Sequence, residues 1–553
     1  MTSAASPSSG RWLYGPARDL LIGCGLWYAL AFLAFSFAGE QIRLGGAMAL
    51  LPFIILVFST PHYGATLLRV YERREDRRAY TFFAVWATAF LLMCFAVGVH
   101  SAIVGSWIVT IYLTWSPWHY TGQNYGIAVM FLRRRGAELT PVVKRFVYAS
   151  FSLSYLLTFL ALHSGARASH YAPFTYDTPN YRFLSLGLPA GFTEIAFAVV
   201  ATAYLVALGG AGVLLLRRSR PRDLAPAAAL ALTQALWFSI PIALRYWRVD
   251  PYVEPWTSDY GTYYFLWIAV GHAVQYLWVT SYYARARGGW SGHGAYLSKV
   301  MLAGAAAWVL PALLFAPGAL GRLPFDAGLS ILVASLVNIH HFILDGAIWK
   351  LRDGRVARIL VRSATEAAGT PTPERPARRW IGPVIWATGL LCVAVIVLGK
   401  WEREIGVRHA ARAGDVERVR TAVERLERLG RDSPDLRLAL GKTLARRGDP
   451  NAALLEYRRA IDLYPNAAAW LAVGKLFAQQ ERWRQAADAY ERAVALRPEG
   501  ALGHYELGVA RLALHRPAAA RDAFARAAEL DPGRKIHRVM LERAERALAD
   551  APE

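Results

Sequence analysis

Long apolar runs separated by short polar loops dominate the first 400 residues of the chain. Most are roughly 18–25 residues long, about the length at which a helix crosses the hydrocarbon core of a bilayer. Eleven such runs can be drawn, at residues 19–38, 44–61, 80–99, 101–132, 143–163, 190–216, 225–244, 260–283, 297–318, 327–349 and 380–399. The pattern predicts an all-α membrane domain over residues 1–400, a polytopic transmembrane helical bundle of about eleven spans.

Basic residues alternate between the loops that join these runs. Arg and Lys gather in the loops near residues 69–78, 133–145, 217–222, 285–299 and 350–362, whereas the segments 163–183, 245–261 and 321–326 are mixed in charge. Cytoplasmic loops of membrane proteins carry the excess of Lys and Arg. The alternation therefore predicts a protein of the bacterial inner membrane with a cytoplasmic N-terminus and a C-terminal domain outside, in the periplasm.

The composition of the chain excludes some classes of function. The chain is 55% hydrophobic with a mean hydropathy of +0.25, which exceeds that of an ordinary soluble protein of this length. The net charge of +22 is explained by the basic loops, so we expect no nucleic-acid partner. The three cysteines lie in apolar runs and form no CxxC pair, which excludes a zinc-finger site.

The chain becomes charged and rich in alanine beyond residue 400, and an internal repeat begins there. Gly441, Gly474 and Gly508 are spaced 33 and 34 residues apart. Each is followed at fixed offsets by Ala, an aromatic residue, Ala and Pro: Ala453, Tyr457, Ala460 and Pro465; Ala486, Tyr490, Ala493 and Pro498; Ala520, Phe524, Ala527 and Pro532. Small residues let two helices pack closely, and proline ends the second helix.

This repeat resembles the tetratricopeptide repeat. The resemblance predicts a soluble α-solenoid over residues 435–553, closed by a capping helix at residues 534–549, with a degenerate first repeat and connector at residues 401–434. Such arrays usually offer a concave surface to a protein or peptide partner. A spacer that stabilises an oligomer is the alternative.

Five histidines lie within or beside the apolar runs, on the side of the basic loops: His62, His119, His272, His340 and His341. They precede the next basic residue by seven to fourteen positions, which places them roughly 10–20 Å from that edge. They come from four different runs but share one depth. Because neutral imidazole is the commonest metal ligand, this shared depth predicts a metal site inside the membrane domain.

Polar residues follow these histidines at helical spacing. Gln123 lies four residues after His119 with Tyr125 nearby, and Tyr276 lies four residues after His272. Asp345 follows His341 by four, so its carboxylate would be a ligand or would hold that imidazole. We expect Asp345, Tyr276, Gln123 and Tyr125 to be catalytic or to line the pocket.

The sequence leaves open which of the adjacent residues His340 and His341 is the metal ligand. Neighbouring side chains on a helix point about 100° apart, so a single metal takes only one of them unless the helix is distorted. Asp345 shares a face with His341, which favours His341 over His340. A hydrogen-bonded core histidine, a proton relay and a polar transport path are the other readings of these residues.

Three segments resemble the Brp/Blh family of membrane β-carotene dioxygenases: PHYGAT from Pro61, WSPWHYTGQ from Trp115 and GHAVQY from Gly271. The resemblance implies an iron-dependent oxygenase acting on a long apolar substrate, with His62, His119 and His272 as iron ligands. Tyr276 stands where the family has a second histidine, so His340 or His341 would have to complete the set.

The leading hypothesis is a membrane-embedded iron oxygenase or desaturase-type oxidoreductase acting on a lipid or isoprenoid, an apolar molecule carried by the membrane. A zinc-dependent membrane hydrolase with the same histidines and Asp345 is the first alternative. The second is a non-enzymatic anchor, assembly factor or transporter that acts through its repeats.

Overall fold

The structure of the protein is a computed structural model that describes residues 11–36, 55–165, 180–246, 265–287, 290, 292–317, 319–350, 354–361 and 381–550. Most of the predicted loops at 163–183 and 245–261, the linker at 364–379 and most of the predicted span at 44–61 lie outside these ranges. The described residues are helical, with two isolated β-bridges and no strand among them. The predicted all-α class is therefore confirmed over this part of the chain.

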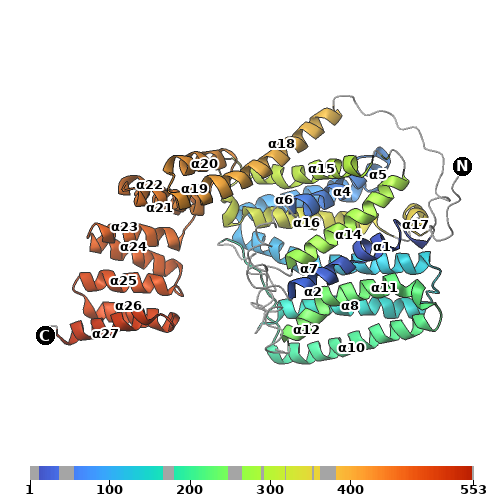
Figure 1. Cartoon of the computed structure of the whole chain (residues 1–553), viewed down its shortest axis with the longest axis horizontal. Helices are drawn as coiled ribbons and strands as arrows, with labels where there is room; N and C mark the ends of the chain where they lie inside the picture. The colour runs from blue at the N-terminus through green and yellow to red at the C-terminus, as the bar shows by residue number, and fades with distance from the viewer. Residues whose placement is uncertain are drawn as a thin grey trace. The chain divides into compact units, whose positions relative to one another are not determined.

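Two compact units make up the chain: residues 1–311 with 331–393, and residues 312–330 with 394–553. The helices of the larger unit run side by side in Figure 1. Its elements are α1 Pro16–Arg18, η2 Asp19–Gly23, α2 Leu26–Ser36, η4 Ile55–Ser59, α4 Thr60–Tyr71, α5 Arg74–Ala79, η5 Phe82–Ala87, α6 Thr88–His100, α7 Ala102–Arg134, α8 Pro141–His163, α10 Ala190–Leu216, α11 Pro221–Gln234, η7 Ala235–Ser239, α12 Ile240–Tyr246, α14 Phe265–Ala286, α15 His293–Leu314, α16 Leu329–Ile348, α17 Gly354–Leu360 and α18 Ile381–Trp401.

Seven helices of the described residues are long and apolar enough to cross a membrane, by length and composition: Phe82–His100, Pro141–His163, Ala190–Leu216, Pro221–Ala243, His293–Leu314, Leu329–Ile348 and Pro383–Ala413. The predicted count of eleven is not supported. The predicted span at 19–38 is interrupted at Gly25, which adopts a φ of 77° between η2 and α2. α7 and α14 are long enough, but their histidines, glutamines, tyrosines and tryptophans make them less apolar than the other seven.

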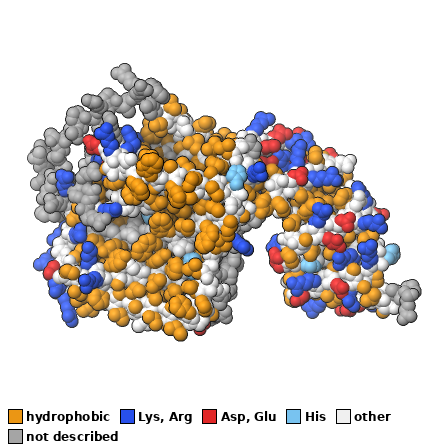
Figure 2. Space-filling model, turned by 180° about the vertical axis from the view of Figure 1, so that it is seen from behind, with side chains coloured by type: hydrophobic (Ala, Val, Ile, Leu, Met, Phe, Trp, Pro, Cys, Tyr) orange, Lys and Arg blue, Asp and Glu red, His pale blue; other side chains and the backbone are white. Residues whose placement is uncertain are grey.

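α16 is the most buried of the seven candidate spans. Of its most apolar 18-residue stretch, 78% is buried, against 22% for the corresponding stretch of α10. α10 exposes large apolar side chains such as Phe192, Ile195 and Leu205. Figure 2 shows hydrophobic side chains over the visible face of this unit. The helix that carries His340, His341 and Asp345 therefore lies in the interior of the unit rather than at its surface.

Paired helices form the repeat unit, and Figure 1 shows the last of them as a stack. Its elements are η9 Phe325–Ala327, η11 Glu402–His409, α19 Ala410–Ala413, α20 Val416–Arg428, α21 Pro434–Arg446, α22 Pro450–Leu463, α23 Ala467–Gln479, α24 Trp483–Leu496, α25 Ala501–Ala513, α26 Pro517–Leu530 and α27 Lys535–Ala549. Charged side chains of both signs cover its visible face in Figure 2.

Glycine and the aromatic residue of each repeat are in direct contact. A β-carbon placed on Gly441 would lie 2.4 Å from Tyr457, one on Gly474 2.4 Å from Tyr490, and one on Gly508 2.7 Å from Phe524. The aromatic ring of the second helix thus fills the space that the missing side chain of the first helix leaves. This is the packing reason for the repeat spacing in the sequence.

A buried arginine joins neighbouring repeats. The Arg437 guanidinium donates hydrogen bonds to Asp432 at 2.6 Å, to Glu427 at 2.7 Å and to Glu456 at 3.3 Å. Burial lowers the pKa of Arg437, but its hydrogen bonds to Asp432 and Glu427 outweigh this effect and raise the pKa above its ordinary value. We call Arg437, Asp432, Glu427 and Glu456 the arginine cluster.

The segment 312–330 belongs to the same compact unit as the repeats. Arg403 forms an ion pair with Asp326, and the Arg431 guanidinium lies 4.7 Å from the centre of the Phe325 ring. A β-carbon on Gly430 would lie 2.7 Å from Ala316. The loop between α15 and α16 therefore packs against the first repeat.

Candidate metal centre

Four helices each contribute one histidine to a single buried group. His62 lies on α4, His119 on α7, His272 on α14 and His341 on α16. One ring nitrogen of each lies within 4.8 Å of one ring nitrogen of every other. We call these four residues the histidine cluster. Four of the five histidines that the sequence predicted at one depth are therefore close to one another in space.

The spacing of the nitrogens suits a common ligand. The Nε2 atoms of His272 and His62 are 3.0 Å apart, and the His341 ring centroid lies 4.1 Å from that of His62. His119 lies with its ring centroid 4.9 Å from those of His272 and His341. With metal–nitrogen bonds of about 2.0–2.1 Å, tetrahedral ligand nitrogens are roughly 3.4 Å apart. The four imidazoles fit one first-row metal ion.

Three nitrogens of the cluster are buried with no hydrogen-bond partner: Nδ1 of His272 and the Nε2 atoms of His119 and His341. The two Nε2 atoms lie near the carboxylate of Asp345. Their nearest carboxylate oxygen, Oδ2 of Asp345, is 3.8 Å and 3.4 Å away, respectively. Buried polar atoms in native proteins are nearly always satisfied, and an exception calls for a physical explanation. A metal ion between the rings would satisfy both Nε2 atoms, so the residues present fit a metal.

The tautomer of His341 follows from its neighbours. Thr66 Oγ1 lies 2.8 Å from His341 Nδ1 and donates its proton to Asp345 Oδ1 at 2.9 Å. Since the hydroxyl has one proton to give, it accepts from the Nδ1–H of His341. The lone pair of His341 is therefore on Nε2, the nitrogen that faces the other histidines.

Asp345 is anchored through one of its two oxygens. Oδ1 accepts hydrogen bonds from Thr66 and, at 2.6 Å, from the Tyr276 hydroxyl, which in turn accepts one from Trp349 Nε1 at 3.0 Å. Oδ2 is thereby directed toward His119 and His341. The sequence reasoning missed Thr66 and Trp349, although each lies one helical turn after a predicted site residue, His62 and Asp345 respectively.

Gln123 and Tyr125 have different surroundings. Gln123 donates hydrogen bonds to the backbone carbonyl of His272 and to the side chain of Gln275, both at 3.1 Å, so it fixes α7 against α14. Tyr125 instead packs its ring against Tyr148 and Phe151. Two residues correspond to about 200° around a helix, which explains why Tyr125 lies away from the cluster.

His340 does not join the histidine cluster. Its Nε2 lies 2.9 Å from the Thr88 hydroxyl, and its ring stacks near Tyr71. A cavity of about 370 Å³, lined among others by Tyr71, Thr88 and His340, lies on this side of α16. Of the adjacent pair, the undistorted helix thus brings only His341 to the other three histidines, as the shared face with Asp345 indicated.

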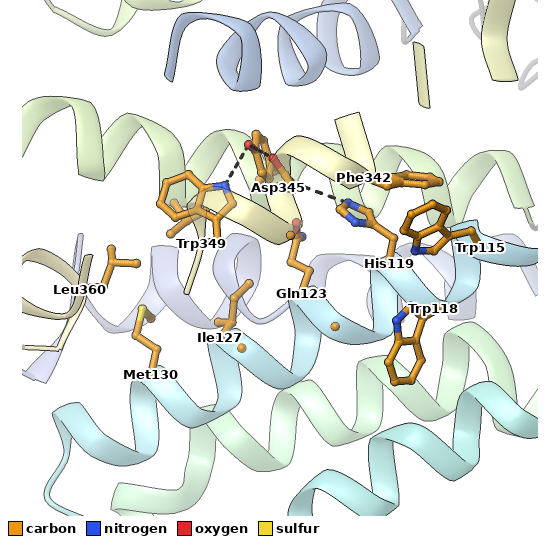
Figure 3. Close-up of a pocket in the computed structure, with 15 residues that line it drawn as sticks. Trp115, Trp118, His119, Gln123, Ile127, Met130, Phe342, Asp345, Trp349 and Leu360 are labelled. Carbon is orange, nitrogen blue, oxygen red and sulfur yellow. Dashed lines mark hydrogen bonds and ion pairs between the residues drawn. The ribbon is translucent and has the colours of Figure 1, made fainter. Parts of the chain in front are cut away.

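A cavity of about 340 Å³ borders the cluster on the other side (Figure 3). His119, Gln123, Tyr276 and Asp345 supply its polar atoms. The remaining lining is apolar or glycine: Trp115, Trp118, Gly122, Gly126, Ile127, Met130, Val279, Phe342, Gly346, Trp349 and Leu360. Most ligand pockets have this composition, an apolar wall with a few polar groups that fix orientation.

The comparisons with known proteins concern the C-terminal unit. The family model described as tetratricopeptide repeat matches residues 407–468 and 471–535, and the first match includes the weaker unit expected before residue 435. The C-terminal unit is therefore built of tetratricopeptide repeats, a module that suggests protein–protein interaction. No curated protein matches the chain.

Several solved structures are similar to parts of this chain. MamA from Desulfovibrio magneticus RS-1 is 22% identical over 28% of this chain and 92% of its own, with a TM-score of 0.23. YrrB, titled a TPR protein with an unusual peptide-binding site, is 19% identical over 30% of this chain and 81% of its own, with a TM-score of 0.23. These matches lend no support to the Brp/Blh resemblance, which stays a prediction.

Proposed function

We propose that the protein is a membrane-embedded, metal-dependent oxidoreductase whose repeat unit binds a protein or peptide partner. The single observation that carries the proposal is the histidine cluster, four imidazoles from four helices with three buried nitrogens that lack a hydrogen-bond partner. A membrane anchor alone has no use for such a cluster, since each polar group inside a membrane domain is costly.

Placement in the bacterial inner membrane is supported by the seven apolar helices and by the alternation of basic loops. The outward apolar side chains of α10 would contact lipid. The packing of the loop 312–330 against the first repeat suits an arrangement in which both lie on the periplasmic side, as the alternation predicts.

His62, His119, His272 and His341 would hold the metal. Imidazole ligands suit iron, zinc, copper and nickel, and the resemblance of the three motifs to the Brp/Blh family implies iron. Bound iron would supply one-electron redox chemistry toward dioxygen. The chain's own contribution is to fix the rings: Thr66 sets the tautomer of His341, and Gln123 holds the backbone of α14 beside His272.

Asp345 would act beside the metal rather than as an isolated charge. Its Oδ2 faces the rings of His119 and His341 and also borders the cavity, where it can accept a proton or complete the ligand set. Tyr276 and Trp349 keep the carboxylate in this orientation through their hydrogen bonds. The apolar cavity wall excludes water from this region, which suits an apolar substrate that arrives from the bilayer.

A zinc-dependent hydrolase remains the second candidate, because the same four imidazoles also suit zinc. Zinc would lower the pKa of a bound water and make it the nucleophile. The scarcity of polar groups in the cavity favours the oxidoreductase, since a hydrolytic site must bind the polar bond that it cleaves.

The test is the metal content of the full-length protein purified in lipid nanodiscs. We expect about one iron per chain in the wild type, loss of that iron in His119→Ala, and retention in the matched control His340→Ala, whose histidine is adjacent to a cluster member. Stoichiometric zinc instead of iron would favour the hydrolase. Metal-free protein after anaerobic purification with either metal supplied would overturn the proposal and leave a membrane-tethered repeat scaffold.

A further inference from the structure

The cavity beside the histidine cluster is long and narrow because it follows one face of α7. Its lining residues on that helix recur at helical spacing from Trp115 through His119 and Gln123 to Met130. Fifteen residues of helix correspond to about 22 Å. Figure 3 shows Gln123, Ile127 and Met130 in sequence along α7, with Trp349 and Leu360 on the facing side.

Glycines open this cavity. Gly122 and Gly126 on α7 and Gly346 on α16 line it, and a β-carbon on any of them would meet nothing within 4 Å. Glycine inside a helix costs roughly 1 kcal/mol relative to alanine, so it needs a reason. Some helix glycines elsewhere are explained by close packing: a β-carbon on Gly64 would lie 1.7 Å from the Val300 carbonyl oxygen, whereas Gly209 and Gly212 on α10 have no such contact. No such contact explains the three cavity glycines.

Two of these glycines mark the side on which the cavity is open. Gly122 and Gly346 are exposed, whereas Gly126 is half-buried. Gly122 lies one turn after His119, and Gly346 directly follows Asp345. The opening between α7 and α16 therefore leads directly to the unpartnered Nε2 of His119, whose side chain is only 10% exposed.

We propose that this cavity binds one unbranched hydrocarbon chain, which enters sideways between α7 and α16 past Gly122 and Gly346 and lies along α7. The role of the bound chain as a substrate rests on the proposed function. The binding of the chain in the cavity does not. A partly open cavity that extends along α7 with apolar and aromatic walls suits a straight chain, and side chains at the glycines would narrow it. The end beside His119 and Asp345 would hold the carbon that reacts.

Photoaffinity labelling tests the proposal on the full-length protein in nanodiscs. The probe is a straight-chain alcohol that carries a diazirine, and labelled residues are mapped by mass spectrometry. We expect labels on the cavity face of α7 and on α16, displaced by excess unlabelled straight-chain alcohol and not by a ring-ended hydrocarbon. Labels confined to outward-facing residues of α10, or equal displacement by both competitors, would overturn the proposal.

Leucine variants locate the entrance. Gly122→Leu and Gly346→Leu should each lower cavity labelling about tenfold, the change that corresponds to ~1.4 kcal/mol of binding free energy. Gly209→Leu and Gly212→Leu are the matched controls, because both glycines lie on α10 and also have nothing within 4 Å of an added β-carbon. Equal labelling in the Gly122→Leu, Gly346→Leu and control proteins would contradict the proposed entrance.

The metal content of the same samples separates this inference from the proposed function. Gly122 and Gly346 are not cluster members, so their leucine variants should keep the metal of the wild type. Wild-type protein that holds metal but shows no cavity label would overturn the chain-binding inference alone. Protein that labels in the cavity but binds no metal would overturn the proposed oxidoreductase alone.

Discussion

The histidine cluster and the arginine cluster, which is centred on the buried Arg437, are both groups of polar side chains, but their hydrogen-bonding groups are satisfied in opposite ways. In the arginine cluster, Arg437 donates hydrogen bonds to three carboxylates, and Glu456 also pairs with Arg459. In the histidine cluster, the groups are four imidazoles of the same kind. Nε2 of His62 and Nε2 of His272 lie 3.0 Å apart, but Nε2 of His119, Nε2 of His341 and Nδ1 of His272 have no hydrogen-bond partner among the described residues. Among the described residues, the charges of the first cluster have partners, whereas the second keeps nitrogens without a hydrogen-bond partner.

This difference separates a structural role from a binding role. Charges of opposite sign that satisfy one another hold two repeats together and leave nothing for a ligand. Like groups that converge without satisfying one another are stable only if something else binds between them. The comparison supports a stabilising role for the arginine cluster in the repeats and agrees with the metal binding proposed for the histidine cluster.

Removal of a histidine from the cluster should have the largest effect. We expect His272→Ala to abolish stoichiometric metal binding, because it removes one of the four ligand nitrogens, the one that lies 3.0 Å from Nε2 of His62. Metal analysis of the nanodisc protein measures this effect. Full metal content in both His272→Ala and His62→Ala would show that the nitrogens converge without binding an ion.

Removal of Arg437 should destabilise the repeats without affecting the metal. Arg437→Ala removes a hydrogen-bond donor from the buried Glu456, the half-buried Asp432 and the exposed Glu427. Because Glu456 keeps its pair with Arg459, we expect a loss of about 1–3 kcal/mol in the stability of the repeats. Hydrogen–deuterium exchange of α21 and α22 in the full-length protein measures the loss. The control is Arg420→Ala, which breaks an exposed pair with Glu417 and should change exchange little. Lost metal in Arg437→Ala would contradict the division of roles.

Asp345→Asn should weaken metal binding without abolishing it. Partners that orient ligating histidines typically contribute 10- to 100-fold in metal affinity, and Asp345 lies beside two of the four rings. Competition with a chelator of known affinity measures the change. Affinity equal to the wild type would remove Asp345 from the site.

Gly474→Ala tests the packing of the repeats on a smaller scale. The added methyl group would lie 2.4 Å from the Tyr490 ring, and overpacking of this kind typically costs about 1–3 kcal/mol. Faster exchange in α23 and α24 is the expected result. Slower exchange would mean that helix propensity outweighs the clash.

His340→Ala should have the smallest effect on metal content, none that metal analysis detects. The ring of His340 is hydrogen-bonded to the Thr88 hydroxyl, on the side of α16 away from the other four rings' meeting point. Metal loss equal to that of His272→Ala would show that both adjacent histidines are ligands.

Much of the fold follows from local patterns in the sequence. The repeats are specified by glycine, alanine and aromatic residues at fixed offsets, and these residues contact one another within a single helix pair. Apolar run length predicts helices well, but not the number of spans, because the helices that carry polar residues, α7 and α14, are less apolar than those that face outward.

The sequence by itself indicated which histidines are candidates for one site, since each of them precedes a basic loop by seven to fourteen residues. It also determined that His341 shares a face with Asp345. Only the tertiary structure decided that His341 meets His62, that Thr66 and Trp349 complete the surroundings of the site, that Tyr125 lies elsewhere, and that glycines open a cavity beside His119. The physical reason is that the rotation of each helix about its own axis is set by packing against its neighbours, and residue spacing along one helix carries no information about those neighbours.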